Sequence, residues 1–144
     1  MKILLTAINA KYIHSNLAVY NLRAYVAHYA KGMDDSDTVE IGEYTINNQM
    51  EDILEGIYKA KPDVLMFSCY IWNIAYVEEL SEEFHKLRPE VPIWVGGPEV
   101  SYETESFLRQ HPQITGVMIG EGEKTFCELA EYYAGESRRD KETE

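Results

Sequence analysis

Basic side chains are scarce in this sequence. Its 144 residues include 13 Lys and Arg against 25 Asp and Glu, which gives a formal net charge of -12. A protein that binds the phosphate backbone of nucleic acid needs clustered Lys and Arg, because neutralising phosphates releases their counterions. The charge balance therefore argues against a nucleic-acid partner.

Long apolar runs and cysteine clusters are also missing. No apolar run approaches the ~20 residues needed to span a bilayer, and the run ILLTAI after Met1 and Lys2 is too short and unflanked for a signal peptide. Cys69 and Cys127 lie far apart without a CxxC or Cys/His pattern, so neither a disulfide framework nor a protein-built zinc or iron-sulfur site is indicated. We expect a cytoplasmic protein without a membrane partner.

The remaining segments predict one compact α/β domain. Short β-rich runs alternate with segments whose apolar residues recur every three or four positions, which is typical of βα units. The run TVEIGEY alternates apolar and polar residues and is expected at a sheet edge, whereas the other runs are continuously apolar, as strands buried on both faces are. The expected strands are Lys2–Ile8, Thr38–Tyr44, Val64–Ser68, Ile93–Val95 and Gly116–Ile119.

Helices are expected between and after these strands. One of them, within Ser101–Gln110, has only Phe107 and Leu108 as apolar anchors. Gly135 offers a helix stop, and the charged residues 136–144 cannot bury enough surface to order themselves, so we expect a linker after a domain of residues 1–135. The other helices have apolar stripes at Val19, Leu22, Val26 and Tyr29; at Met50, Ile53, Leu54 and Ile57; at Val77, Leu80, Phe84 and Leu87; and at Phe126, Leu129 and Tyr133.

The expected fold is a flavodoxin-like parallel sheet. Right-handed crossovers between five parallel strands, with the alternating strand at an edge, fit the order 2-1-3-4-5 with helices on both faces. Ligands of such sheets bind beyond the carboxyl ends of the strands. This rule brings together the loops Asn9–Ser15, Ser68–Asn73, Gly96–Tyr102 and Gly120–Glu123.

These loops lack the features of three familiar sites. A phosphoacceptor receiver needs acidic residues after its first and third strands, but Ala7–Asn9 and Ser68–Cys69 stand there. The first loop, NAKYIHSN, has no glycine and only Ser15 as a hydroxyl to wrap a flavin phosphate. The run GEGEKT places Thr125 at the third glycine of a dinucleotide fingerprint and two glutamates beside the supposed pyrophosphate.

The loops instead offer large apolar side chains and glycines. Tyr70, Ile71 and Trp72 follow the third strand in SCYIWN, and Gly96 and Gly97 end the fourth in IWVGGPEV. Two glycines there indicate either a tight turn or a close approach of a ligand to the backbone. Together these loops could bind a flat macrocycle.

The combination of SCYIWN, VGGPEVSYE and GEGEKTFCEL, with KYIHSNLAVYNLRAY after the first strand, carries a family resemblance. The chain resembles the amino-terminal cobalamin-binding domain of radical S-adenosylmethionine proteins over most of residues 1–135. Many full-length members of that family are, or are presumed to be, methyltransferases or related enzymes.

The resemblance implies that the corrin ring rests on the carboxyl ends of the strands, with its nucleotide tail between the sheet and the helices of the first and last units. The glycines would let the ligand approach where a β-carbon would collide. The 4Fe-4S cluster and S-adenosylmethionine would belong to a C-terminal barrel with a CxxxCxxC motif, which this sequence lacks, so the chain is expected to be a non-catalytic first domain whose partner is that barrel. The residues expected to contact cobalamin are Asn9, Tyr12, His14, Ser68, Tyr70, Trp72, Asn73, Gly96, Gly97, Pro98, Glu99, Gly120, Glu121 and Gly122.

His14 is a candidate cobalt ligand. Cobalamin domains that supply a histidine as lower ligand have a first loop that reads DxHxxG, and here Tyr12 replaces the Asp and Leu17 replaces the Gly. A ligating imidazole is normally oriented by a carboxylate, which Tyr12 does not supply. His14 is therefore either the ligand or a loop histidine at the start of the first helix.

Other interpretations stay open for the remaining residues. Tyr70 and Trp72 could pack against a neighbouring domain, and Asn73 could cap the third helix. Glu121 and Glu123 could contact the ligand or interact with the dipole of a helix N-terminus. The alternative function is a flavodoxin-like interaction module that binds no corrin and docks a partner through its aromatic loop. A reading frame that continues into CxxxCxxC would favour the cobalamin domain.

Overall fold

The sheet has the predicted topology. The computed structural model describes residues 1–10, 17–120 and 122–143, and these form a five-stranded parallel sheet in the order β2-β1-β3-β4-β5. Each strand begins and ends within one residue of its prediction, so the flavodoxin-like fold is confirmed. The strands are β1 (Lys2–Asn9), β2 (Thr38–Thr45), β3 (Val64–Ser68), β4 (Ile93–Gly96) and β5 (Gly116–Met118).

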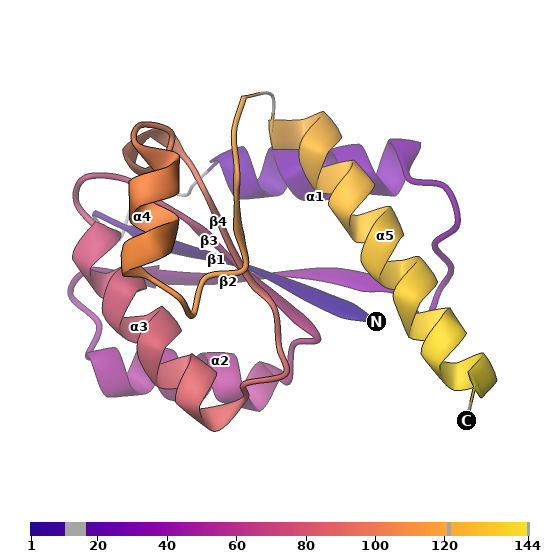
Figure 1. Ribbon diagram of the computed structural model, residues 1–144, viewed down its shortest axis with the longest axis horizontal. Coiled ribbons are helices and arrows are strands. Elements are labelled where there is room, and N and C mark those ends of the chain that lie inside the picture. Colours follow the sequence, from indigo (N-terminus) through magenta and orange to yellow (C-terminus); the bar gives the residue numbers. More distant parts are fainter. Residues whose placement is uncertain (11–16, 121, 144) are drawn as a thin grey trace.

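Helices cover both faces of this sheet. Figure 1 shows α1 and α5 on one side of the strands and α2 and α3 on the other. A short 3-10 helix, η1, directly follows β4, and α4 then precedes β5. The helices are α1 (Leu17–Tyr29), α2 (Met50–Ala60), α3 (Ile74–Leu87), η1 (Pro98–Val100), α4 (Thr104–Gln110) and α5 (Gly122–Thr143).

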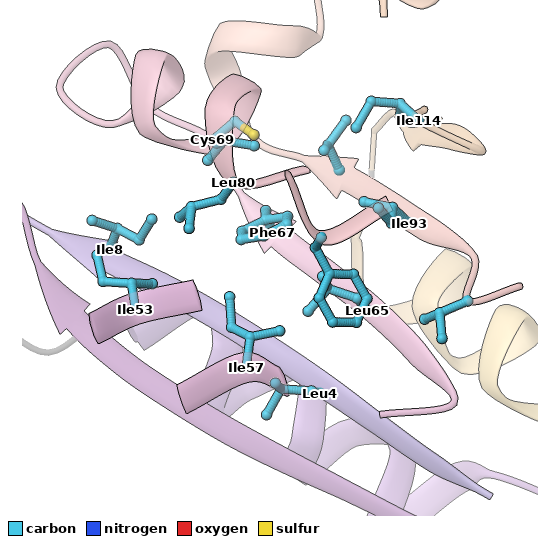
Figure 2. Close-up of a cluster of buried hydrophobic side chains, with 14 of the residues drawn as sticks. Leu4, Ile8, Ile53, Ile57, Leu65, Phe67, Cys69, Leu80, Ile93 and Ile114 are labelled. Carbon is cyan, nitrogen blue, oxygen red and sulfur yellow. The ribbon is translucent and has the colours of Figure 1, made fainter. Parts of the chain in front are cut away.

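Two apolar cores lie on the two faces of the sheet. Successive side chains of a strand point to opposite faces, so Leu5 of β1 packs with the α1 and α5 side whereas Leu4 packs with the α2 and α3 side. Figure 2 shows the latter cluster, in which Ile53 and Ile57 of α2 face the sheet. Each fully buried side chain of this size stabilises the fold by roughly 1.5–3 kcal/mol relative to exposure.

The edge position of β2 is confirmed, since this strand pairs only with β1 and alternates between more and less exposed residues. Two predicted core residues are exposed instead, Tyr29 at 57% and Leu87 at 51%. Both are the last residue of their helix, and the buried part of each stripe ends one turn earlier, at Val26 and at Phe84. The apolar stripe therefore overestimates the buried length of α1 and α3.

The expected helix stop at Gly135 is wrong, because α5 continues to Thr143. Glycine inside a helix costs about 1 kcal/mol relative to alanine, and contacts of Arg138 offset this cost. Its guanidinium donates to the Asp37 carboxylate at 2.6 Å and to the Ala134 carbonyl at 2.9 Å, and it lies 3.3 Å from the Asp34 carboxylate. The helix is thus tied to the chain just before β2, and the role of residues 136–144 as a linker stays a prediction.

Candidate functional site

A cavity of about 510 Å³ opens at the carboxyl ends of the strands, on the side covered by α1 and α5. Its floor consists of apolar side chains from β1, β3 and β5 and from α1. Leu5 and Met66 are neighbours across β1 and β3, and Met118 pairs with Gly96 across β5 and β4. Val19 and Leu22 of α1 close the floor from the helix side. The cavity therefore extends from the loops down between sheet and helices.

Among the described residues, the rim of the cavity includes members of three of the four predicted loops. It includes Ser101 and Glu123 beside half of the residues that the sequence analysis singled out. Contact of these residues with a ligand stays a prediction. The predicted residues at the rim are Ser68, Tyr70, Gly96, Gly97, Pro98, Gly120 and Gly122.

The other predicted residues stand elsewhere. Tyr12, His14 and Glu121 lie outside the residues that the structure describes. Among the described residues, the cavity lining does not include Asn9, Trp72, Asn73 or Glu99.

Asn73 has a structural role that the sequence did not reveal. Its side chain is fully buried, its amide nitrogen donates to the carbonyls of Ile8 at 3.1 Å and Ser68 at 2.9 Å, and its oxygen accepts from the Tyr70 amide at 2.8 Å. It occupies the N-cap position of α3 but makes no capping bond with its side chain. Asn73 instead fastens the end of β1 to the loop after β3.

The aromatic loop after β3 is ordered by similar contacts. The rings of Tyr70 and Trp72 stack with centroids 4.5 Å apart and planes 2° apart, and the Trp72 indole donates to the Ile8 carbonyl at 3.2 Å. Trp72 is nevertheless 44% exposed and Ile71 is 78% exposed. The loop thus presents apolar surface next to the cavity rim.

Glu43 of β2 joins the two elements that flank the first loop. Its carboxylate accepts from the Tyr20 hydroxyl of α1 at 2.6 Å and from the Asn9 side chain at 3.4 Å. The hydrogen bond to Glu43 raises the pKa of Tyr20 above its ordinary value, because ionised Tyr20 would face a carboxylate. Asn9 is therefore engaged at the edge of the sheet rather than in the cavity.

The two glycines after β4 have different neighbours. A β-carbon on Gly96 would lie 3.3 Å from the Met66 methyl and 3.6 Å from the Met118 β-carbon, so it would point toward the cavity floor. A β-carbon on Gly97 would instead meet the backbone of Cys69, and Gly97 has a positive φ of 116°. The prediction that both glycines make room for a ligand therefore has a geometric basis for Gly96, whereas Gly97 is required by the turn.

The floor residues were missed as site residues, although their strands and helix were predicted. A side chain that faces a cavity in a buried strand has the same apolar character as one that faces the core. Ser101 had a signal, because it lies in the quoted segment VGGPEVSYE. The missed lining residues are Leu5, Ala18, Val19, Leu22, Met66, Ser101, Met118 and Glu123.

The cavity contains little charge. Glu123, in the first turn of α5, is the only ionisable carboxylate among the described lining residues, and none of them is Lys or Arg. This lining gives no cationic support to a ligand held mainly through several phosphates. Within residues 1–10, 17–120 and 122–143, no group of three or more His, Cys, Asp or Glu side chains is placed to hold a metal ion, and no helix is long and apolar enough to cross a membrane.

The B12-binding domain model matches residues 3–130 of this chain. The chain belongs to the B12-binding domain family. This B12-binding domain is 34% identical over 80 residues to the cobalamin-dependent radical SAM methyltransferase TokK of Streptomyces tokunonensis. That match covers 56% of the chain but only 12% of the relative, so the chain spans a small part of that relative's length.

Two solved structures share the fold of this B12-binding domain. The cobalamin-dependent S-adenosylmethionine radical enzyme OxsB superimposes with a TM-score of 0.70 at 18% identity, over 94% of this chain and 19% of that one. A cobalamin-binding protein from Desulfitobacterium hafniense DCB-2 superimposes with a TM-score of 0.56 at 13% identity, over 96% of this chain and 57% of that one.

Proposed function

We propose that this domain holds cobalamin at the carboxyl ends of its strands and presents it to a radical S-adenosylmethionine barrel in the full-length protein, for a methyl transfer or a related reaction. The observation that carries this proposal is the apolar cavity at the ligand-binding edge of a B12-binding domain. The sequence similarity to a cobalamin-dependent radical SAM methyltransferase supports the reaction class.

The residues present fit cobalamin. Its flat aromatic base needs a deep apolar slot, and Leu5, Leu22 and Met66 line such a floor. The corrin ring is too broad for that slot and needs an open platform, which the loops at the rim provide. Gly96 leaves the space above Met66 and Met118 free of a β-carbon.

The chain's own residues would bind and orient rather than catalyse. Cobalamin supplies the cobalt chemistry of methyl transfer, and the cleavage of S-adenosylmethionine belongs to a cluster outside these residues. The floor excludes water from the bound base. Hydrogen bonds from Trp72 and Asn73 to the Ile8 carbonyl tie the loop after β3, which supplies Tyr70 to the rim, to the end of β1. We assign no catalytic residue to this domain.

The exposed aromatic loop favours a neighbouring domain rather than a separate function. Ile71 of this loop is 78% exposed, and Tyr102 in the loop after η1 is 81% exposed. Exposed large side chains that gather near a cavity often mark an interaction surface. A corrin ring or the barrel above it would cover such a surface. The alternative, an interaction module without corrin, would leave the apolar cavity unexplained.

Titration of the chain with hydroxocobalamin, followed by its visible absorption, tests the proposal. We expect saturable binding by the wild type and an affinity about tenfold weaker in Gly96→Ala, whose methyl group would enter the cavity. Gly42→Ala is the matched control, because Gly42 is also a strand glycine and its β-carbon would make only ordinary contacts in β2, away from the cavity. Absence of binding by the folded wild type would refute the proposal.

A further inference from the structure

We infer that the cavity selects among cobamides by their lower base, favouring an apolar base such as the dimethylbenzimidazole of cobalamin over a purine such as adenine. This inference rests on the proposed function and concerns the base rather than the corrin ring. It predicts which cobamide the protein would take when several are present.

The side chains of the cavity floor offer no hydrogen bond to a base. Leu5, Val19, Leu22 and Met118 are between 1% and 9% exposed, and Met66 is 3% exposed. The polar side chains of the described lining residues, including Ser68, Ser101 and Glu123, belong to the carboxyl end of β3, the loop after η1 and the start of α5. Polar contacts are therefore confined to the rim.

The main-chain groups of Leu5 and Met66 are also engaged. Leu5 lies in β1 between Ile41 of β2 and Met66 of β3, and Met66 lies between Leu5 and Trp94 of β4. Both residues thus stand in central strands whose amide and carbonyl groups belong to the parallel ladders. A base that packed against Leu5 and Met66 would find the main-chain donors and acceptors of these two residues already paired.

The two base classes differ in what they would bury. Dimethylbenzimidazole presents a benzene ring with two methyl groups, whereas adenine presents a ring with two nitrogens and an exocyclic amine. Buried polar groups without partners lose their hydrogen bonds to water and gain none, which weakens binding by about ten- to hundredfold. The methyl groups of the benzimidazole gain apolar contact instead.

Shape alone would discriminate less than polarity. Met66 and Met118 are unbranched and can adjust to bases of different outline. The size difference between the two bases is therefore accommodated more easily than the unpaired nitrogens. This argument makes polarity at the floor the quantity to change in an experiment.

Three ligands separate the possibilities in the wild-type chain. Cobalamin, the adenine-bearing cobamide and cobinamide, which has a corrin ring but no base, are titrated under the same conditions. We expect cobalamin to bind at least tenfold more tightly than the adenine-bearing cobamide, and cobinamide to bind more weakly than cobalamin. Equal affinities for cobalamin and cobinamide would overturn the inference while leaving the proposed function intact, and absence of binding by all three would overturn both.

A polarity change at the floor tests the cause. Met66→Gln places an amide of nearly the same shape at the floor, and Met66→Leu keeps it apolar. We expect the preference for cobalamin over the adenine-bearing cobamide to fall several-fold in Met66→Gln and to persist in Met66→Leu. Because the two ligands are compared within one variant, a general loss of stability cancels from the ratio.

Met118→Gln and Met118→Leu repeat the comparison on β5 if Met66→Gln does not fold. An unchanged preference in a folded glutamine variant, or an adenine-bearing cobamide that binds the wild type as tightly as cobalamin, contradicts the inference.

Discussion

Gly97 lies directly against the backbone of Cys69. A β-carbon at Gly97 would stand 3.0 Å from the Cys69 nitrogen and closer still to its carbonyl oxygen. The Cys69 amide in turn donates to the Gly96 carbonyl at 2.7 Å. The loops that follow β3 and β4 are therefore fixed to each other by their main chains.

Gly97→Ala should destabilise the fold by about 2 kcal/mol or more, because a side chain at positive φ is strained and the methyl group would collide with Cys69. Urea denaturation of the unliganded chain measures this change. Gly120→Ala is the control, since Gly120 also has a positive φ of 85° but a β-carbon there meets no atom of the described residues within 4 Å. Equal losses in the two variants would show that the contact with Cys69 costs nothing.

Asn73→Ala should destabilise the chain by about 2–4 kcal/mol. The change removes three hydrogen bonds and leaves the Tyr70 amide and two carbonyls without this partner in a buried site. Asn9→Ala, by comparison, removes a single long hydrogen bond at an exposed position among the described residues and should change the free energy of unfolding by less than about 0.5 kcal/mol. If the two variants lose similar amounts of unfolding free energy, the hydrogen bonds of Asn73 do not stabilise the fold as proposed.

Thr6→Val should stabilise the chain by about 1 kcal/mol. The Thr6 side chain is fully buried, and its hydroxyl has no hydrogen-bond partner among the described residues, so valine replaces an unpaired polar group with a methyl group of the same shape. Thr45→Val is the contrasting variant, because the Thr45 hydroxyl accepts from the Asn47 amide at 3.2 Å and its loss should destabilise. Thermal and urea denaturation of both variants test the opposite signs.

The attachment of α5 to Asp34 and Asp37 should depend on pH. Hydrogen bonds from Ser36, supported by Arg138, lower the pKa of Asp34 to about 2. Burial alone would raise the pKa of Asp37, but the Asp34 amide, the N-terminal ammonium and Arg138 together outweigh burial and hold it below its ordinary value. Both carboxylates therefore stabilise the fold above their unfolded pKa of about 3.8, and this stability should be lost as the pH falls from about 4 towards 2.

Arg138→Ala should weaken that pH dependence and destabilise the chain by about 1 kcal/mol, since it removes one partner of the buried Asp37 carboxylate. Far-ultraviolet circular dichroism should show a small loss of helix from the carboxyl end of α5. Arg139→Ala removes only an exposed pair with Glu136 and should have little effect. If the two arginine variants behave alike, Arg138 does not hold the helix.

The ligation of cobalt by His14 stays a prediction that spectroscopy can decide. Because Tyr12 supplies no orienting carboxylate, we expect bound cobalamin to keep its own base displaced and its lower face occupied by water or by nothing. Electron paramagnetic resonance of the cobalt(II) form should then lack nitrogen superhyperfine splitting. A nitrogen triplet that disappears in His14→Ala would identify this histidine as the ligand.

Periodicity predicted the fold well because strand order and helix faces follow from repeated apolar contacts. The edge strand β2 and the loops at the rim could be placed from such patterns alone. The cavity floor could not be predicted, because Leu5 and Met66 have the same apolar character as ordinary core residues. The roles of Asn73 and Gly97 could not be predicted either, because both depend on main-chain groups of residues distant in the sequence. The charge of residues 136–144 wrongly predicted that the helix ends at Gly135, because Arg138 binds a carboxylate about a hundred residues earlier in the sequence.

The helix α5 begins at Gly122 on the cavity rim and runs through 22 residues to Thr143, which corresponds to about 33 Å at 1.5 Å per residue. Arg138 fastens its second half to Asp37. The helix is thus held against the domain near both of its ends, at its first turn and at Arg138. One continuous helix, whose first turn forms part of the cavity wall, consequently sets the distance from the cavity to Thr143.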